Sequence, residues 1–308
     1  MAHLETFESY RPLLFSIAYR MLGSALEAED IVQEAYLRYE KAQDVQSVKA
    51  YLVTIVTRLC LDYLKSAKVQ REEYIGTWLP EPVLTGESPG AILDRHESIS
   101  MAFLIMLERL SPLERAIFLL RDVFDYRYAE IAPIVAKSEA NCRRYYRQAR
   151  QFLRQQPRFE PSPAEGNRLV ASFLQAAATG DTDGLTNLLV EDVTFYGDGG
   201  GKAPALRQPL TGRDAVIRFL LMGVYRLLPA DTHVEMAEVN GTPSLLFWGQ
   251  DGTLYFVMHL TLAYHQITAI RNILNPDKLA YIRRQPFPRR LQPRGGFSLS
   301  RFYQLRPL

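Results

Sequence analysis

The chain has 308 residues, 47% of them hydrophobic, and a formal net charge of +2. This length and balance predict a globular protein of two or three modest domains, and they exclude a largely disordered chain. Two isolated cysteines exclude a disulfide framework and a structural zinc site. Because the sequence shows neither a signal-sequence pattern nor an apolar run long enough to span a bilayer, we expect a cytoplasmic protein that does not enter a membrane.

Helical periodicity dominates residues 1–72. A first helix is predicted from about Phe7 to Leu22, and a capping box of Ser24 and Glu27 begins a second one after Gly23. A third helix carries one buried stripe, made by apolar residues at three- and four-residue spacing: Val48, Tyr51, Leu52, Ile55, Val56, Leu59 and Tyr63. We therefore expect an all-helical first domain.

The helical pattern stops in residues 73–92. The sequences WLPEP at 78–82 and GESPG at 86–90 concentrate helix-breaking residues in this window. We interpret the window as a linker between two helical domains.

Residues 93–156 return to helical periodicity and end in a predicted helix-turn-helix. Residues 127–135 predict a short helix, residues 136–137 a tight turn, and Ser138 the N-cap of a helix that runs to Leu153. The order and the lengths of these elements are typical of a DNA-binding helix-turn-helix.

The second helix of this motif has one apolar and one cationic face. Its cationic face carries Arg143, Arg147, Arg150 and Arg154, and its apolar face carries Cys142, Tyr146, Ala149 and Leu153. Like charges at these spacings each cost a helix about 0.2–0.5 kcal/mol, which a DNA phosphate backbone would offset; a solvated charged face is the alternative. The candidate DNA contacts are Ser138, Glu139, Asn141, Arg143, Arg144, Arg147 and Arg150.

Residues 164–280 have the pattern of an α+β domain. Predicted helices at 168–178 and 185–189 precede segments that alternate like strands, most clearly at 254–262. With a further helix near 214–227 and hairpin turns at Asn240-Gly241 and Asp251-Gly252, we expect a curved antiparallel sheet wrapped by helices. Residues 281–308 are rich in arginine and proline, so we expect a solvated basic tail.

The helical half resembles the extracytoplasmic-function (ECF) sigma factors of the sigma-70 family. The resemblance rests on AEDIVQEAYLR at 28–38, KAYLVTIVTRLCLDYLKSA at 49–67, LSPLERAIFLLRDVF at 110–124 and SEANCRRYYRQAR at 138–150. It implies that residues 1–72 are sigma region 2, that 93–156 are sigma region 4, and that the protein directs transcription initiation without a cofactor. A stand-alone helix-turn-helix regulator is the alternative, but it leaves the first two segments unexplained.

The same resemblance implies two further binding surfaces. Core RNA polymerase would contact the second helix through Asp30, Ile31, Gln33, Glu34 and Leu37. The −10 promoter element would meet basic residues along the third helix, which grip a single-stranded backbone: Lys49, Arg58, Lys65, Lys68 and Arg71. The −35 duplex would meet the helix-turn-helix.

The C-terminal half resembles the SnoaL-like, nuclear-transport-factor-2-like fold, a cone-shaped sheet whose interior in other proteins holds small molecules or performs catalysis. Three motifs are similar to those of sigma factors that carry such an extension: WLPEP at 78–82, DGGGK at 198–202 and NPDKL at 275–279. The resemblance implies regulation through contacts of Trp78, Pro80, Asp198, Gly199, Gly200, Gly201, Lys202, Asn275, Pro276, Asp277, Lys278 and Leu279. A small-molecule ligand in the cone is a further candidate partner.

Catalysis is the alternative use of such a cone. Asp198 and His259, with Tyr196 or Tyr255, would then form an acid–base set around its interior. A lone histidine in a strand is more often structural, and no second matched acid or base accompanies it. We therefore favour a regulatory domain that is not an enzyme.

Overall fold

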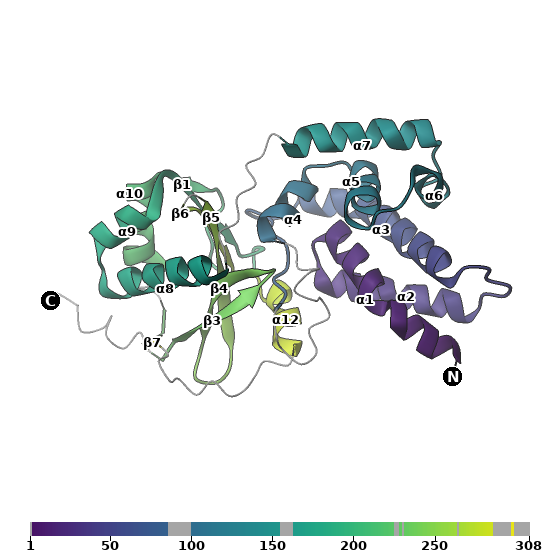
Figure 1. The fold of residues 1–308 in the computed structure, drawn as a ribbon. Coiled ribbons are helices and arrows are strands. Elements are labelled where there is room, and N and C mark those ends of the chain that lie inside the picture. The colour runs from purple at the N-terminus through teal and green to yellow at the C-terminus, as the bar shows by residue number, and fades with distance from the viewer. Residues whose placement is uncertain are drawn as a thin grey trace. The chain divides into compact units, whose positions relative to one another are not determined.

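The structure is a computed structural model that describes residues 2–85, 100–154, 163–224, 228–229, 231–263, 265–285 and 297–298. Contacts divide the chain into two compact units (Figure 1). The first contains residues 1–73 and 92–157, and the second contains residues 74–91 and 158–308. Most of the expected linker therefore belongs to the second unit.

The first unit is helical, as predicted. Its first three helices are α1 (Ala2–Leu22), α2 (Ala25–Glu40) and α3 (Val48–Glu72). Gly23, whose φ is 68°, separates α1 from α2, and the Ser24 hydroxyl caps α2 by accepting the Glu27 N–H at 3.2 Å. The core of these helices includes Phe15, Tyr19, Val32, Leu52 and Val56, all buried.

The second part of this unit contains the helix-turn-helix. Its elements are α4 (Met101–Glu108), α5 (Pro112–Phe118), the π-helix η1 (Leu119–Val123), α6 (Tyr128–Ile134) and α7 (Glu139–Arg154). The turn between α6 and α7 lies where the sequence predicts it, with Ala136 at a positive φ of 52°.

The second unit is α+β, as expected. In chain order it comprises α8 (Pro163–Thr179), α9 (Thr182–Leu188), β1 (Leu189–Asp198), β2 (Leu210–Thr211), α10 (Arg213–Phe219), the π-helix η2 (Leu220–Val224), β3 (His233–Val239), β4 (Thr242–Trp248), β5 (Leu254–Ala263), β6 (Gln266–Ile273), α12 (Pro276–Arg284) and β7 (Phe297–Ser298). The strands form one sheet in the order β2-β1-β6-β5-β4-β3-β7. Neighbouring strands are antiparallel, except for the parallel pair of β1 and β6.

The two faces of the sheet have different partners. Helices α8, α9 and α10 lie against one side of the sheet (Figure 1). They supply apolar side chains to a core that also contains alternate strand residues such as Phe195, Phe247, Phe256 and Met258. Helix α12 contacts β5, where the Arg283 guanidinium donates to the Leu254 carbonyl at 2.8 Å. The core therefore lies between the sheet and α8–α10.

The expected boundary of the basic tail is wrong. Residues 281–284 form the end of α12, and Tyr281 and Ile282 are buried. Tyr281 and Ile282 continue the apolar face of the helix that includes Leu279. The arginines around them make this apolar pattern hard to recognise in the sequence. Residues 286–296 and 299–308 of the expected tail lie outside the described residues.

Among the described residues, no helix is both long enough and apolar enough to cross a membrane.

Candidate DNA-binding and linker-binding sites

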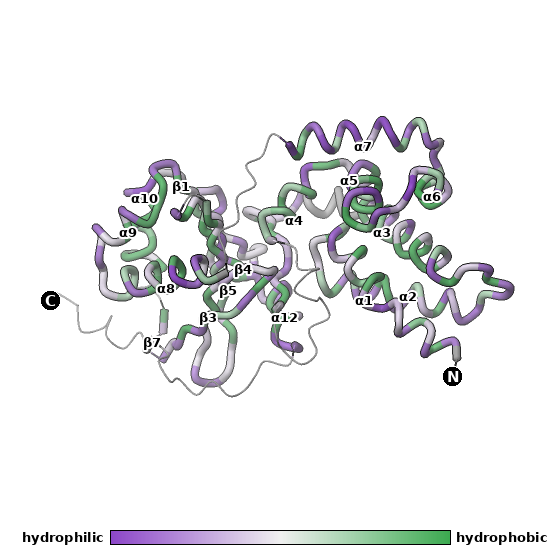
Figure 2. The backbone as a smooth tube through the Cα atoms, in the orientation of Figure 1, coloured by the Kyte–Doolittle hydropathy of each residue, from purple (hydrophilic) through white to green (hydrophobic). Residues whose placement is uncertain are grey.

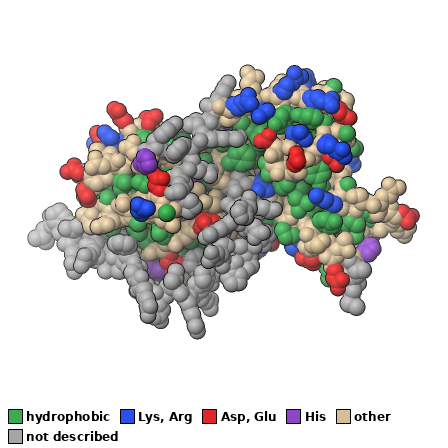
Figure 3. Space-filling view, in the orientation of Figure 1, with side chains coloured by type: hydrophobic (Ala, Val, Ile, Leu, Met, Phe, Trp, Pro, Cys, Tyr) green, Lys and Arg blue, Asp and Glu red, His purple; other side chains and the backbone are tan. Residues whose placement is uncertain are grey.

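Helix α7 exposes a continuous basic face. Cys142, Ala149 and Leu153 are buried beneath it, whereas its arginines are exposed: Arg143, Arg144, Arg147, Arg150 and Arg154. Figure 2 shows α7 as largely hydrophilic, and Figure 3 shows Lys and Arg side chains gathered over it. An open surface cavity of about 410 Å³ lies on this face, lined by Tyr146, Arg147, Arg150, Gln151 and Arg154. The helix offers an anionic backbone a row of cations.

The arginines of this face differ in their partners. The Arg143 guanidinium donates to Glu139 at 2.7 Å and lies 5.1 Å from the Tyr128 ring centroid. Within the described residues, Arg147 and Arg154 have no carboxylate within ion-pair distance. Arg143 is thus held in one orientation, which suits a contact to a base edge, whereas the other two suit contacts to phosphate.

A hydrogen bond that the sequence does not reveal positions α7. The Tyr146 hydroxyl donates to Asp122 at 2.6 Å, and its ring lies 6.2 Å from that of Phe118. Burial and the Asp122 carboxylate raise the pKa of Tyr146, so the phenol stays a donor. Asp122 lies in the π-helix η1, which local sequence patterns do not predict.

The expected polymerase-binding residues share one face of α2. Asp30, Gln33 and Leu37 are exposed, and Glu34 accepts from Arg38 at 2.7 Å. Leu37 is 43% exposed, so α2 presents an apolar side chain among its charged neighbours. Ile31 is partly buried. An apolar side chain framed by acidic groups suits a basic protein surface with an apolar pocket.

The expected −10 contacts do not form one cluster. The Arg58 guanidinium donates to the carbonyls of Ile134 at 3.0 Å and Pro133 at 2.7 Å, at the end of α6. Lys49 lies 5.8 Å from the Tyr126 ring centroid, and Lys65 pairs with Asp62 at 2.7 Å. The side chains of Lys68 and Arg71 lie outside the described part of α3.

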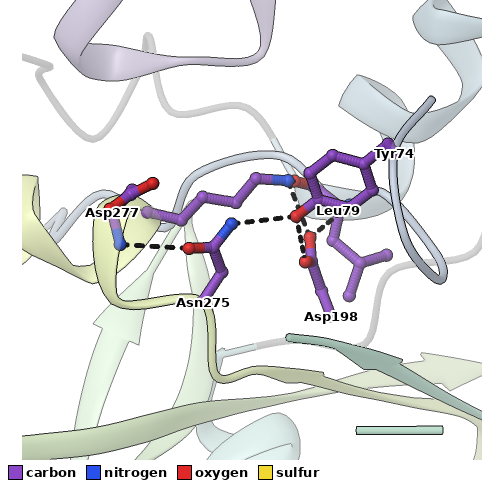
Figure 4. Close-up of polar contacts among 6 residues, drawn as sticks. Tyr74, Leu79, Asp198, Asn275 and Asp277 are labelled. Carbon is purple, nitrogen blue, oxygen red and sulfur yellow. Dashed lines mark hydrogen bonds and ion pairs between the residues drawn. The ribbon is translucent and has the colours of Figure 1, made fainter. Parts of the chain in front are cut away.

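In the second unit, residues of the three motifs meet around Asp198 (Figure 4). This aspartate is fully buried at the end of β1. Its carboxylate accepts from the Leu79 N–H at 2.7 Å, from the Lys278 ammonium at 2.7 Å and from the Tyr74 hydroxyl. Three donors compensate one buried negative charge, so the carboxylate fixes the linker onto the domain. We call this arrangement the clasp.

Lys278 contributes the positive charge of the clasp. Its ammonium lies 4.1 Å from the Trp78 ring centroid and 4.9 Å from that of Tyr74, and it also donates to the Leu79 carbonyl. Burial and Asp198 raise the pKa of Tyr74, which keeps its hydroxyl protonated as a donor. The expected contact of Trp78 is therefore a cation–π contact with a buried lysine.

The glycines of DGGGK let this loop approach the linker and the NPDKL segment closely. A side chain at Gly200 would collide with Asn275 and the Tyr74 hydroxyl, and one at Gly201 would collide with Ile75. Asn275 donates to that hydroxyl at 2.9 Å and caps α12 by accepting the Asp277 N–H at 3.1 Å. Gly199 takes part through its carbonyl, which closes the loop.

The remaining motif residues surround this contact. Lys202 and Asp277 form an exposed ion pair, and Pro276 opens α12. Leu279 and Pro80 are buried.

The acid–base set is not assembled in the interior of the cone. His259 lies on β5 between Met258 and Leu260, which both face the core, so its side chain lies on the opposite face. There it contacts the Ser244 hydroxyl at 3.0 Å, and burial lowers its pKa to about 3. Asp198 is engaged in the clasp. His259 and Asp198 therefore do not have the placement that the catalytic alternative requires.

Comparisons with known proteins show what the chain is similar to. Residues 6–69 match the family model Sigma-70 region 2, and residues 100–153 match Sigma-70, region 4. ECF RNA polymerase sigma factor SigJ of Mycobacterium tuberculosis is 40% identical over 88% of this chain and 91% of its own length. The probable ECF RNA polymerase sigma factor SigI of that organism is 28% identical over 90% of this chain and 94% of its own. The crystal structure of SigJ covers 90% of this chain and 98% of its own, with a TM-score of 0.74 and 35% identity.

Proposed function

The chain belongs to the ECF family of RNA polymerase sigma factors, and on that premise we propose which of its surfaces bind polymerase, promoter DNA and linker. As a sigma factor it directs promoter-specific transcription initiation. The observation that carries the proposal for the C-terminal domain is the buried Asp198, which holds the linker by its main chain.

Core polymerase binds the exposed face of α2 that contains Asp30, Gln33 and Leu37. We expect Leu37→Asp to weaken binding to core polymerase about tenfold or more, because a charge replaces the apolar side chain at the centre of the contact. Leu4→Asp is the matched control, since Leu4 is 48% exposed and lies on α1. Fluorescence anisotropy with labelled protein measures both, and equal affinities of the two variants would contradict the assignment.

The −35 element binds α7, with base contacts near its N-terminus and phosphate contacts further along. Arg143→Ala is expected to alter the preference among promoter sequences, because that guanidinium is oriented by Glu139 and Tyr128. Arg154→Ala is expected to weaken binding evenly and to lower the salt dependence by about one unit. Binding titrations over a series of salt concentrations measure both effects, and identical behaviour would sink the division of roles.

The −10 element binds basic residues of α3, among them Lys49, Arg58 and Lys65. Arg58 then exchanges its two hydrogen bonds to α6 for contacts with a single-stranded backbone.

The C-terminal domain acts on transcription through the linker. Within one chain the effective concentration of linker at the clasp is in the millimolar range, so weak individual contacts suffice to keep it bound. The linker joins the two DNA-reading regions. Binding of the linker at the clasp therefore limits the distance that the linker can span between those regions.

A small molecule in the cone is a separate prediction. The rings of Phe247 and Phe256 stack in this interior, with 4.1 Å between their centroids, and Phe195 packs against Phe219. A ligand of this interior would have to be apolar and to displace aromatic side chains. The catalytic alternative has no assembled acid–base set to support it.

A further inference from the structure

The linker is bound at a second place, away from the three motifs. Residues 83–85 lie along the hairpin of β3 and β4. The Thr85 N–H donates to the Glu238 carbonyl at 2.9 Å, and the Asn240 N–H donates to the Val83 carbonyl at 2.9 Å. A short antiparallel bridge joins the same segments. The linker thus adds a short extended segment to the end of the sheet.

Two side-chain amides complete this contact. The Asn240 Oδ1 accepts the Val83 N–H at 3.2 Å. Gln285 binds Leu84 through both of its amide atoms, because its Oε1 accepts the Leu84 N–H at 2.8 Å and its Nε2 donates to the Leu84 carbonyl at 3.3 Å. These amides satisfy the main chain of a buried segment, whose polar groups would otherwise be costly to bury.

Helix α12 connects the two places. Lys278 in its first turn binds the Leu79 carbonyl, and Gln285 at its C-cap binds Leu84. The helix rises about 10 Å over that interval, and an extended linker covers about 16 Å, so the two long side chains reach outward from the ends of the helix. Pro80 and Pro82 favour an extended linker between the contacts.

We infer that the β3–β4 hairpin and Gln285 form a second linker-binding site, which recognises an extended main chain and has Asn240 and Gln285 as its positioning residues. The inference rests on the proposed regulatory role of the clasp and deepens it. The charged Asp198 carboxylate binds the main chain of the first half of the linker, and this second site binds the second half by β-type pairing. Asn240 has a φ of 52°, which asparagine tolerates better than most residues.

Hydrogen exchange at single amides of the full-length protein tests the inference. Asn240→Gly keeps the positive φ and removes the acceptor, and Gln285→Ala removes both amide atoms. We expect exchange about tenfold faster at Val83 in the first variant and at Leu84 in the second. The Leu79 amide, bound at Asp198, is expected to keep its protection.

Three further variants separate local release from general loosening. Asn240→Asp and Gln285→Glu keep the accepting oxygen, so we expect them to restore most of the protection at Val83 and Leu84. Gln250→Ala, the same substitution at an exposed turn, is expected to match wild type. Unchanged exchange at Val83 and Leu84 in the two disruptive variants would overturn the inference. Lost protection with unchanged promoter-directed transcription would instead support the site and refute its regulatory role.

Discussion

Asp198→Ala is expected to lower the free energy of unfolding of the C-terminal unit by about 3–5 kcal/mol and to release the linker. The substitution removes the carboxylate that pairs with the buried Lys278 ammonium, and it leaves the Leu79 N–H and the Tyr74 hydroxyl without this acceptor. Chemical denaturation measures the stability. The emission of Trp78, in a Trp248→Phe background that removes the second tryptophan, reports release of the linker.

The neighbouring pair of Asp277 and Lys202 provides the matched control. It joins the same two motifs but is exposed, with side-chain exposures of 61% and 58%. Asp277→Ala should therefore cost about 0–1 kcal/mol, because solvent screens the pair. If both aspartate variants lose the same stability, the buried charge is not what holds the clasp.

Gly200→Ala is expected to disrupt the clasp by steric collision with Asn275 and Tyr74. An added Cβ would lie 2.2 Å from the Asn275 Nδ2 and 2.9 Å from the Tyr74 hydroxyl, and the residue has a φ of +57°. The left-handed backbone costs about 1–2 kcal/mol for alanine, and the collision adds about 1–3 kcal/mol or displaces the linker. Denaturation and the emission of Trp78 measure the two effects.

Gly180→Ala isolates the backbone contribution. Gly180 has a similar φ of +70°, and no atom lies within 4 Å of an added Cβ. This variant should lose only the backbone contribution and should leave the emission of Trp78 unchanged. Equal losses at the two glycines would mean that Gly200 is needed for its own conformation and not for the approach of the linker.

The helix-turn-helix was predictable because its signals are local. The Ser138 cap and the alternation of Cys142, Ala149 and Leu153 with arginines lie within one short segment, and α6 and α7 begin and end within a residue or two of the expected positions. The strand at 254–262 follows the same rule, since β5 spans Leu254–Ala263. Periodicity needs no knowledge of distant residues.

Contacts to the main chain of distant residues could not be predicted. Arg58 binds carbonyls that lie 75 or more positions away in sequence, and Gln285 binds Leu84 across 201 positions. A backbone acceptor is present at every residue, so no side-chain pattern marks it. The sequence predicts the clasp only through its three motifs. It does not predict that Tyr74 takes part in the clasp, or that Asn240 binds the linker beside it.

The placement of His259 follows from a local pattern and bears on the catalytic alternative. The alternation along β5 put His259 on the face opposite Met258 and Leu260, and those apolar residues form the core. The interior of a cone-shaped sheet is the face that the helices cover. The same alternation therefore argued against an interior histidine.

Transcription from a cognate promoter by core polymerase with the full-length protein tests most directly whether the clasp conveys regulation. Wild type, Asp198→Ala and Asp277→Ala are compared at equal occupancy of core polymerase. We predict that Asp198→Ala changes the amount of transcript severalfold and that Asp277→Ala matches wild type. Equal transcript from all three proteins, with the linker shown to be released in Asp198→Ala, would contradict the account.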